Sequence, residues 1–397
     1  MAATWIDIDL DAVEANYREV RRVVNPASRV MAVVKADAYG LGAIPVAQAL
    51  QAAGCEAFAV TTVTEGVELR QGGVSGLILV LGPGTAGDWP EALDAGLQLT
   101  VASSEAITGL AEVAARCGQQ ASVHLKLDTG MGRLGFLPDE LPAVAEALAR
   151  TGYVKVDGVY THFARAALRD RRYTQEQYRR FCDMVARLES LGVHPQWRHV
   201  CNSAALLDYP EWHFDFVRTG TLLVGHYPAP GFSSKLKLQD PWQAKSRVLS
   251  IRTVPKGTYV GYQSAYRTRR ETQLAVIAAG YADGFGVEPH LTPQGFVDLV
   301  KILLKQILAW LRIYLGREKV ELNGRTVAVA GKIGMQLTVL DVGKEPCQVG
   351  DEVKLPMRRT LANPRLLRRY WRAGRICGER SGKAGFLPCD REYGEYV

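Results

Sequence analysis

Lys35 is the residue of this chain whose position most strongly suggests chemistry. It follows an apolar run that ends at Val34 and opens the segment 35–42, which reads KADAYGLG. A lysine amine forms a Schiff base with a carbonyl group, and burial lowers the pKa of a lysine and makes it nucleophilic. Tyr39 follows four positions later beside two glycines, which allow a loop to pass close to a ligand. A lysine at the end of a strand is most often only solvated, so the other polar residues must decide between the two interpretations.

Polar residues also follow four later apolar runs of the chain. They are Arg133 after the run 123–127, His162 after 156–161, Asn202 and Ser203 after 197–201, and Arg218, Gly220 and Thr221 at the end of the run 216–218. Each of these alone is more often a structural hydrogen-bonding group than a catalytic one. Their repeated placement at the same end of successive runs is hard to ascribe to chance.

The runs alternate with segments of helical period, which predicts the elements that position these residues. The predicted strands are 30–34, 57–60, 77–81, 97–101, 123–127, 156–161, 197–201 and 216–218, and the predicted helices include 10–24, 44–53, 105–116, 141–150 and 175–191. Eight alternations between residues 9 and 226 favour a (β/α)8 barrel over an open doubly wound sheet. In such a barrel the carboxyl ends of the strands carry the active site, so the polar residues above should share one face.

The loops after the seventh and eighth strands are where barrels commonly bind phosphate. Ser203 offers a hydroxyl and a backbone N–H, and Gly220 and Thr221 offer backbone N–H groups with little bulk in front of them. A reactive lysine opposite a phosphate-binding cup suggests pyridoxal phosphate.

The pattern changes near Tyr227, and short β-rich runs broken by Gly and Pro follow, including 244–254, 274–278 and 326–329. We therefore predict a second, mostly β domain formed by residues 1–8 and 227–397, with an inserted apolar helix near 296–315. Four charged residues in this helix argue against a membrane span: Asp298, Lys301, Lys305 and Arg312. We expect it to bury its apolar side against the barrel, a second subunit or its own domain.

Composition narrows the function classes further. The chain has 397 residues and a net charge of +7, with seven arginines and no acidic residue between Arg358 and Arg375. Such a tract could attract an anion or nucleic acid, but only Tyr370 and Trp371 interrupt it, so we expect a solvated face and no nucleic-acid partner. The seven scattered cysteines and the absence of a signal-peptide pattern favour a cytoplasmic protein without a metal site.

With these residues in place, the chain resembles the alanine racemases, which are fold-type III pyridoxal-phosphate enzymes. The most specific matches are the segments 34–40 (VKADAYG), 127–133 (LDTGMGR) and 280–284 (GYADG). The resemblance extends from residue 4 to at least residue 342.

The resemblance implies a role for each matching residue. Lys35 would hold the cofactor as an aldimine and act as one catalytic base, and Tyr262 would act as the second base from the partner subunit of a homodimer. An arginine at position 218 would face the pyridine nitrogen and keep it unprotonated. The residues implied around the cofactor and its phosphate are Tyr39, Asn202, Ser203, Gly220 and Thr221. His162 would link Arg218 to Tyr262, and Lys126 would be carbamylated. Arg133 would contact the cofactor's phenolic oxygen and, together with Tyr281 and Met335, the substrate.

The chain also departs from the family pattern at four places. Gly334-Met335-Gln336 stands where the family usually has Cys-Met-Asp, and Gln263 stands where a glycine normally follows the tyrosine base. The helix near 296–315 replaces a shorter connection, and the segment 362–368 has no clear counterpart of a C-terminal phosphate-binding tyrosine.

The function predicted is therefore the racemisation of an amino acid by two bases, with alanine as the expected substrate. A serine racemase, a racemase of broad specificity and a decarboxylase of the same barrel type are the alternatives, together with a non-catalytic cofactor-binding protein. Tyr262, and Arg218 in place of a carboxylate, disfavour the decarboxylase. The second domain disfavours the non-catalytic protein, whose relatives consist of the barrel alone.

Overall fold

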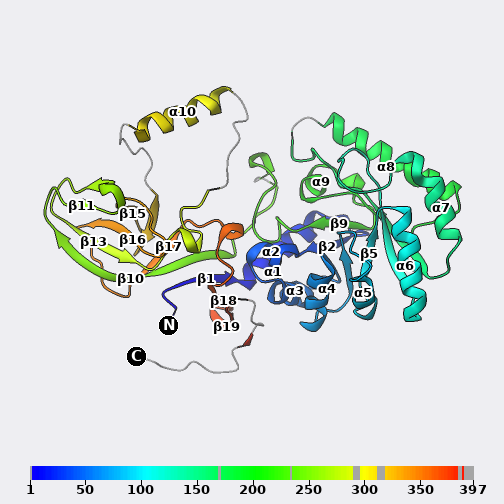
Figure 1. Cartoon of the computed structure of the whole chain (residues 1–397), viewed down its shortest axis with the longest axis horizontal. Coiled ribbons are helices and arrows are strands. Elements are labelled where there is room, and N and C mark those ends of the chain that lie inside the picture. The colour runs from blue at the N-terminus through cyan, green and yellow to red at the C-terminus, as the bar shows by residue number, and fades with distance from the viewer. Residues whose placement is uncertain are drawn as a thin grey trace. The chain divides into compact units, whose positions relative to one another are not determined.

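The computed structural model describes residues 2–168, 171–232, 235–288, 296–310, 318–382 and 387–388. The chain forms two compact units (Figure 1), one of Asp9–Pro241 and one that joins Met1–Ile8 to Trp242–Val397. The first unit thus extends beyond the change of pattern near Tyr227.

Eight parallel strands form the barrel of the first unit, in the order β8-β7-β6-β5-β4-β3-β2-β9. The backbone N–H of Arg218 on β9 donates to the backbone carbonyl of Cys201, just after β8, at 3.0 Å, and this bond helps to close the sheet between its two edge strands. The predicted barrel is confirmed, and each predicted strand overlaps an observed one. The strands are β2 (Arg29–Val33), β3 (Ala57–Val60), β4 (Leu77–Val80), β5 (Gln98–Val101), β6 (Ala121–Lys126), β7 (Val154–Tyr160), β8 (Trp197–His199) and β9 (Phe216–Thr219).

Helices alternate with these strands, and their ends follow local sequence signals. The Ser103 side chain caps the N-terminus of α6 by accepting from the Ala106 N–H at 3.2 Å, and Gly118 ends it with a φ of 64°. The helices are α1 (Leu10–Val23), α2 (Lys35–Gly40), α3 (Ala43–Ala52), α4 (Val63–Gln71), α5 (Trp89–Asp94), α6 (Ser104–Cys117), α7 (Leu141–Ala149), α8 (Arg172–Ser190) and α9 (Ser203–Asp208).

The core of the barrel is apolar in one part and polar in another. Buried apolar side chains of β2, β3, β4 and β9 pack together, among them Met31, Ala59 and Phe216. Phe216 and Arg218 are two positions apart on β9, so they face the same side of the sheet. Arg218 therefore lies on the same side of β9 as Phe216, a member of this apolar cluster, and the packing of the cluster fixes the strand that carries Arg218.

The second unit is an antiparallel ten-stranded sheet in the order β13-β16-β15-β14-β17-β10-β1-β18-β19-β20, with a separate β11–β12 pair. The N-terminal strand β1 pairs with β10, as in Thr4 opposite Ser246. The strands are β1 (Thr4–Asp9), β10 (Trp242–Val254), β11 (Tyr259–Val260), β12 (Tyr266–Arg267), β13 (Thr272–Ile277), β14 (Lys319–Leu322), β15 (Arg325–Val329), β16 (Thr338–Gly343), β17 (Glu352–Leu355), β18 (Leu367–Arg372), β19 (Arg375–Arg380) and β20 (Leu387–Pro388).

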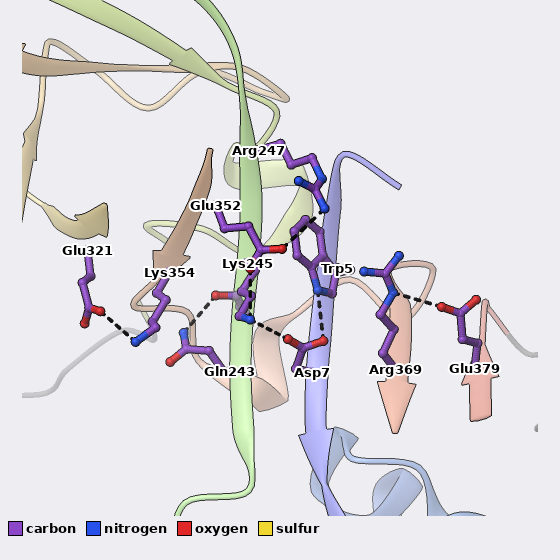
Figure 2. A network of polar contacts seen from close by, with 11 residues as sticks. Trp5, Asp7, Gln243, Lys245, Arg247, Glu321, Glu352, Lys354, Arg369 and Glu379 are labelled. Atoms are coloured by element: carbon purple, nitrogen blue, oxygen red, sulfur yellow. Dashed lines mark hydrogen bonds and ion pairs between the residues drawn. The ribbon is translucent and has the colours of Figure 1, made fainter. Parts of the chain in front are cut away.

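Ion pairs between neighbouring strands cross one region of this sheet, as Figure 2 shows. Lys245 on β10 lies 2.8 Å from the Asp7 carboxylate on β1 and 3.2 Å from Glu352 on β17. Farther along, the Arg369 Nε–H donates to Glu379 at 2.9 Å. Opposite charges on adjacent strands help to fix their register.

The arginine tract differs from the solvated face that we expected. Arg359 and Arg368 are buried, and Arg368 donates hydrogen bonds to the carbonyls of Pro364 and Leu366. The expectation of a solvated face is wrong for these two residues, because both are buried, and the Arg368 guanidinium satisfies backbone carbonyls of the fold.

The inserted helix is present as α10 (Phe296–Trp310), and residues 311–315 of the predicted helix lie outside the described residues. Its described apolar side chains are largely exposed, including Phe296 at 79% and Val297 at 65%. Its burial against another surface remains a prediction. None of the helices in the described residues has the length and hydropathy that a bilayer crossing requires.

Candidate active site

A cavity of about 700 Å³ in the barrel unit is lined by residues from the carboxyl ends of the strands and the loops after them. Every barrel residue that the sequence singled out lines this cavity: Lys35, Tyr39, Lys126, Arg133, His162, Asn202, Ser203, Arg218, Gly220 and Thr221. The barrel topology thus gathers positions that span more than half of the unit's sequence.

Lys35 begins a turn of left-handed helix, where the sequence suggested only a loop. The four residues from Ala36 to Tyr39 have φ values between 49° and 57°. For residues other than glycine this conformation costs about 1–2 kcal/mol each, so the surrounding structure must stabilise it.

Two carboxylates stabilise this turn. Glu65 accepts a hydrogen bond from the Ala36 N–H at 2.6 Å, while its other oxygen accepts from Thr61 and Thr62 at the start of α4. Asp37 accepts from the Ala43 N–H at 2.9 Å at the start of α3. Glu65 was not among the residues predicted from the sequence, although the Thr62-x-x-Glu65 spacing is that of a capping box.

Tyr39 reaches from the turn to Gly220, which follows β9. A Cβ atom at Gly220 would lie 2.6 Å from Tyr39 Cε2 and 2.7 Å from the Val33 carbonyl oxygen, so only glycine fits there. Burial raises the pKa of Tyr39 to about 12, which keeps the phenol protonated and able to donate a hydrogen bond.

Three hydroxyl groups lie beside Gly220. Ser203 Oγ is 2.9 Å from Thr219 Oγ1, and the Thr221 hydroxyl donates to Ser203 Oγ at 3.0 Å. Ser203 and Thr221 line the cavity. Because Asn202 caps α9 through a bond from the Ala205 N–H at 3.1 Å, the start of that helix is fixed beside these hydroxyls.

Arg218 is a buried cation whose Nη hydrogens are all engaged. Nη1 donates to His199 Nδ1 at 2.9 Å and to the His199 carbonyl at 2.8 Å, and Nη2 donates to the carbonyls of Thr161 and Val200. The Nε–H is the one N–H of the Arg218 guanidinium that has no acceptor among the described residues. Burial lowers the pKa of Arg218 to about 10, so it stays protonated at neutral pH.

The cavity is strongly electropositive, and its described lining contains no carboxylate. Burial, followed by the charges of Arg218 and Arg133, lowers the pKa of Lys126 to about 7. Burial and the same neighbouring cations lower the pKa of His162 to about 2, so its ring is neutral. A site of this charge favours an anionic ligand, and Lys35 adds an amine for which the described residues supply no hydrogen-bond or ion-pair partner.

Three predicted site residues belong to the other unit and are exposed there: Tyr262 at 73%, Tyr281 at 49% and Met335 at 57%. Gln263, beside Tyr262, has a φ of 60°, a conformation that favours glycine. Its side chain accepts from Lys332 Nζ at 2.6 Å, which holds the turn to the segment 331–336 that carries Met335.

Comparisons with known proteins agree on one family. The family model described as alanine racemase, N-terminal domain, matches residues 8–228, and the alanine racemase C-terminal domain matches residues 242–364. The chain is 38% identical to an alanine racemase of Symbiobacterium thermophilum over 89% of this chain and 88% of the relative. It is 37% identical to one of Desulforamulus reducens, over 88% of each.

Solved structures give the same result. The alanine racemase of Clostridium difficile 630 superposes with a TM-score of 0.85 at 28% identity, over 96% of this chain and 99% of that one. The alanine racemase of the D-cycloserine producer Streptomyces lavendulae superposes with a TM-score of 0.80 at 33% identity, over 94% and 98%. The resemblance noted from the sequence motifs is therefore confirmed.

Proposed function

This chain belongs to the alanine racemase family, and we propose that it interconverts L- and D-alanine with pyridoxal phosphate as its cofactor. The observation that carries the proposal is the position of Lys35, which lines one cationic cavity together with Arg218 and Ser203. A reactive amine, a buried cation and a hydroxyl cluster are the groups that an aldehyde, a pyridine nitrogen and a phosphate require.

The cavity fits the cofactor in two respects. Because Gly220 has no Cβ, Tyr39 can pack against its backbone, and the Tyr39 phenol lines the cavity together with the hydroxyl residues Ser203 and Thr221, where a phosphate would find donors. The Nε–H of Arg218 is a donor without an acceptor among the described residues, and a pyridine nitrogen is an acceptor. Asn202 and Arg133 line the same cavity. In the proposed arrangement Asn202 lies beside the phosphate, and Arg133 binds the phenolic oxygen of the cofactor.

When bound, pyridoxal phosphate supplies an electron-withdrawing ring that acidifies the Cα–H bond of the amino acid attached to it. Racemisation then requires a base on each face of Cα. Lys35 removes or returns the proton on one face, and Tyr262 does so on the other. His162 lines the same cavity with a neutral ring. The described hydrogen bonds of Arg218 go to His199, Thr161 and Val200, so a link from Arg218 through His162 to Tyr262 stays a prediction.

The working unit is a homodimer in which Tyr262 enters the cavity of the partner subunit. The exposure of Tyr262, Tyr281 and Met335 supports this, because residues that complete a site on another subunit must be accessible in their own. Tyr281, Met335 and Arg133 contact the substrate in this arrangement. The cytoplasmic location expected from the cysteines remains a prediction, and the six described cysteines are free thiols.

Lys126 carries a carbamate in the working enzyme. Its lowered pKa leaves much of the amine neutral near pH 7, and a neutral amine attacks carbon dioxide, with formation of an N–C bond and loss of one proton. The resulting anion would partly balance the charges of Arg133 and Arg218.

The test is racemisation by the purified protein with added pyridoxal phosphate, followed by chiral chromatography over a panel of L-amino acids. We expect alanine to react fastest, and Lys35→Ala to lose both the activity and the visible absorption band of the cofactor–lysine Schiff base. Lys256→Ala, at an exposed lysine of the other unit, should keep both. A wild-type protein without the band would overturn the cofactor assignment, and a faster reaction of serine would overturn the substrate assignment.

A further inference from the structure

We propose that Gln98 and Asp157 hold Arg218 in position through a one-directional chain of hydrogen bonds across the interior of the barrel. This inference deepens the proposed function, because it rests on Arg218 as the residue that faces the cofactor's ring nitrogen. Gln98 and Asp157 are positioning residues in it, since they act through two histidines.

Four hydrogen bonds make up the chain. Arg218 Nη1 lies 2.9 Å from His199 Nδ1, and His199 Nε2 lies 2.8 Å from His124 Nδ1. His124 Nε2 lies 2.7 Å from Gln98 Oε1, and Gln98 Nε2 lies 3.3 Å from Asp157 Oδ2. The five residues come from β9, β8, β6, β5 and β7, so the chain crosses half of the barrel.

The two ends of the chain fix its direction. A guanidinium group can only donate, so His199 Nδ1 must accept and its proton must sit on Nε2. His199 then donates to His124 Nδ1, which places the proton of His124 on Nε2 as well. At the other end, a carboxylate can only accept, so Gln98 turns its amide NH₂ to Asp157 and its carbonyl to His124.

The surroundings keep both histidines neutral and in place. His124 and His199 are fully buried, and burial lowers the pKa of His124 to about 3 and that of His199 well below its ordinary value. The His199 ring stacks on Tyr160 with centroids 4.8 Å apart, and Tyr160 also lies under the Arg218 guanidinium at 5.1 Å. A neutral imidazole has one donor and one acceptor, which is what a directional chain needs.

The need for Gln98 and Asp157 follows from what happens when the amide turns round. An NH₂ group facing His124 would move the proton of that ring to Nδ1 and, in turn, the proton of His199 to Nδ1. Two donors would then face each other between His199 and Arg218, and the guanidinium would have to shift. Asp157 prevents this, because its Oδ2 can only accept from the amide. Its other oxygen, Oδ1, lies 2.7 Å from the Nζ of the exposed Lys155 and takes no part in the chain.

The decisive measurement is the protonation of the histidine rings in wild-type protein without cofactor. Two-bond ¹H–¹⁵N correlations on protein labelled with ring-¹⁵N histidine distinguish the two tautomers. We expect His124 and His199 to be neutral and protonated on Nε2 between about pH 6 and pH 8. A proton on Nδ1 of either ring would overturn the proposal, whether or not the protein racemises any amino acid.

Gln98→Met tests the consequence for Arg218, because methionine has a similar shape and makes no amide hydrogen bonds. We expect mixed tautomers at both histidines and about a tenfold loss of affinity for pyridoxal phosphate, measured by absorbance titration. Lys155→Met is the matched control, since it removes an exposed partner of Asp157 and leaves the chain intact; it should change neither quantity. Unchanged tautomers and affinity in a folded Gln98→Met protein would contradict the inference.

Discussion

The carboxylate of Glu65 accepts a hydrogen bond of 2.6 Å from the backbone N–H of Ala36, the residue directly after Lys35. Glu65 belongs to α4, so this bond joins the second strand–helix unit of the barrel to the left-handed turn of the first. The strained segment that carries Lys35 is therefore held by a residue that is not part of it.

Glu65→Gln should loosen this turn, because an amide has one acceptor oxygen in place of two. We expect Lys35 to form its Schiff base with pyridoxal phosphate several-fold more slowly, as followed by absorbance, and the free energy of unfolding to fall by about 1 kcal/mol. Thr62→Ala is the control, since Thr62 caps α4 through the Glu65 N–H without touching Ala36. Equal slowing in both variants would show that the bond to Ala36 is unimportant.

Gly220→Ala should damage the phosphate end of the cavity. The added methyl group would lie 2.7 Å from the Val33 carbonyl, and such overpacking costs about 1–3 kcal/mol. We expect at least tenfold weaker binding of pyridoxal phosphate and a lower melting temperature. Gly152→Ala, where nothing lies within 4 Å of the new Cβ, should change neither value. Wild-type affinity in Gly220→Ala would argue against the predicted phosphate position.

Lys126 should become carbamylated in a pH-dependent way. Its pKa is lowered to about 7, so the neutral, reactive amine increases as the pH rises from about 6 to 8. ¹³C NMR with labelled bicarbonate should show a carbamate signal that grows over this range and is absent in Lys126→Met. Lys155→Met, on the neighbouring strand, should keep the signal. A signal that persists in Lys126→Met would place the modification elsewhere.

Tyr262→Phe should impair proton exchange at Cα from one enantiomer far more than from the other. The two bases serve opposite faces of the substrate, and Lys35 remains in this variant. Exchange of the Cα proton with deuterium from L- and D-alanine, measured separately, checks this. Equal losses for both enantiomers would contradict the assignment of Tyr262 to one face.

Hybrid dimers test whether the cavity is shared between subunits. Co-assembly of Lys35→Ala chains with Tyr262→Phe chains should restore activity, because one of the two sites then receives both intact residues. Replacing the Tyr262→Phe chains by the double variant is the control, which leaves no intact site. No recovery in the first mixture would mean that Lys35 and Tyr262 act from the same chain.

Acid should destabilise the protein through its buried histidines. His162 has an ordinary pKa near 6.5 when unfolded and about 2 when folded, so only the unfolded chain gains its proton between these values. Its contribution to stability is complete above about pH 6.5 and is lost as the pH falls, at up to about 1.4 kcal/mol per pH unit. Urea unfolding at several pH values should show a shallower pH dependence of the free energy of unfolding in His162→Asn than in the wild type, and an equal dependence would contradict the prediction.

The sequence predicted the eight barrel strands and ten cavity-lining residues because both depend on local order. Apolar runs of strand length alternate with helical segments, and a barrel places every residue that follows a strand at the same end. The sequence did not predict the burial of Arg359 and Arg368, since a buried arginine and a solvated one look the same in a local pattern.

The sequence by itself therefore determined which residues meet at the mouth of the barrel and to which family the chain belongs. Only the tertiary structure decided how they are held. The turn after Lys35 has backbone angles that alanine and aspartate disfavour, and it forms because Glu65, 29 positions away, accepts its N–H. The orientation of Arg218 likewise depends on His199 and His124, which are 75 positions apart and share one hydrogen bond. Such bonds depend on distances between strands, which no local pattern encodes.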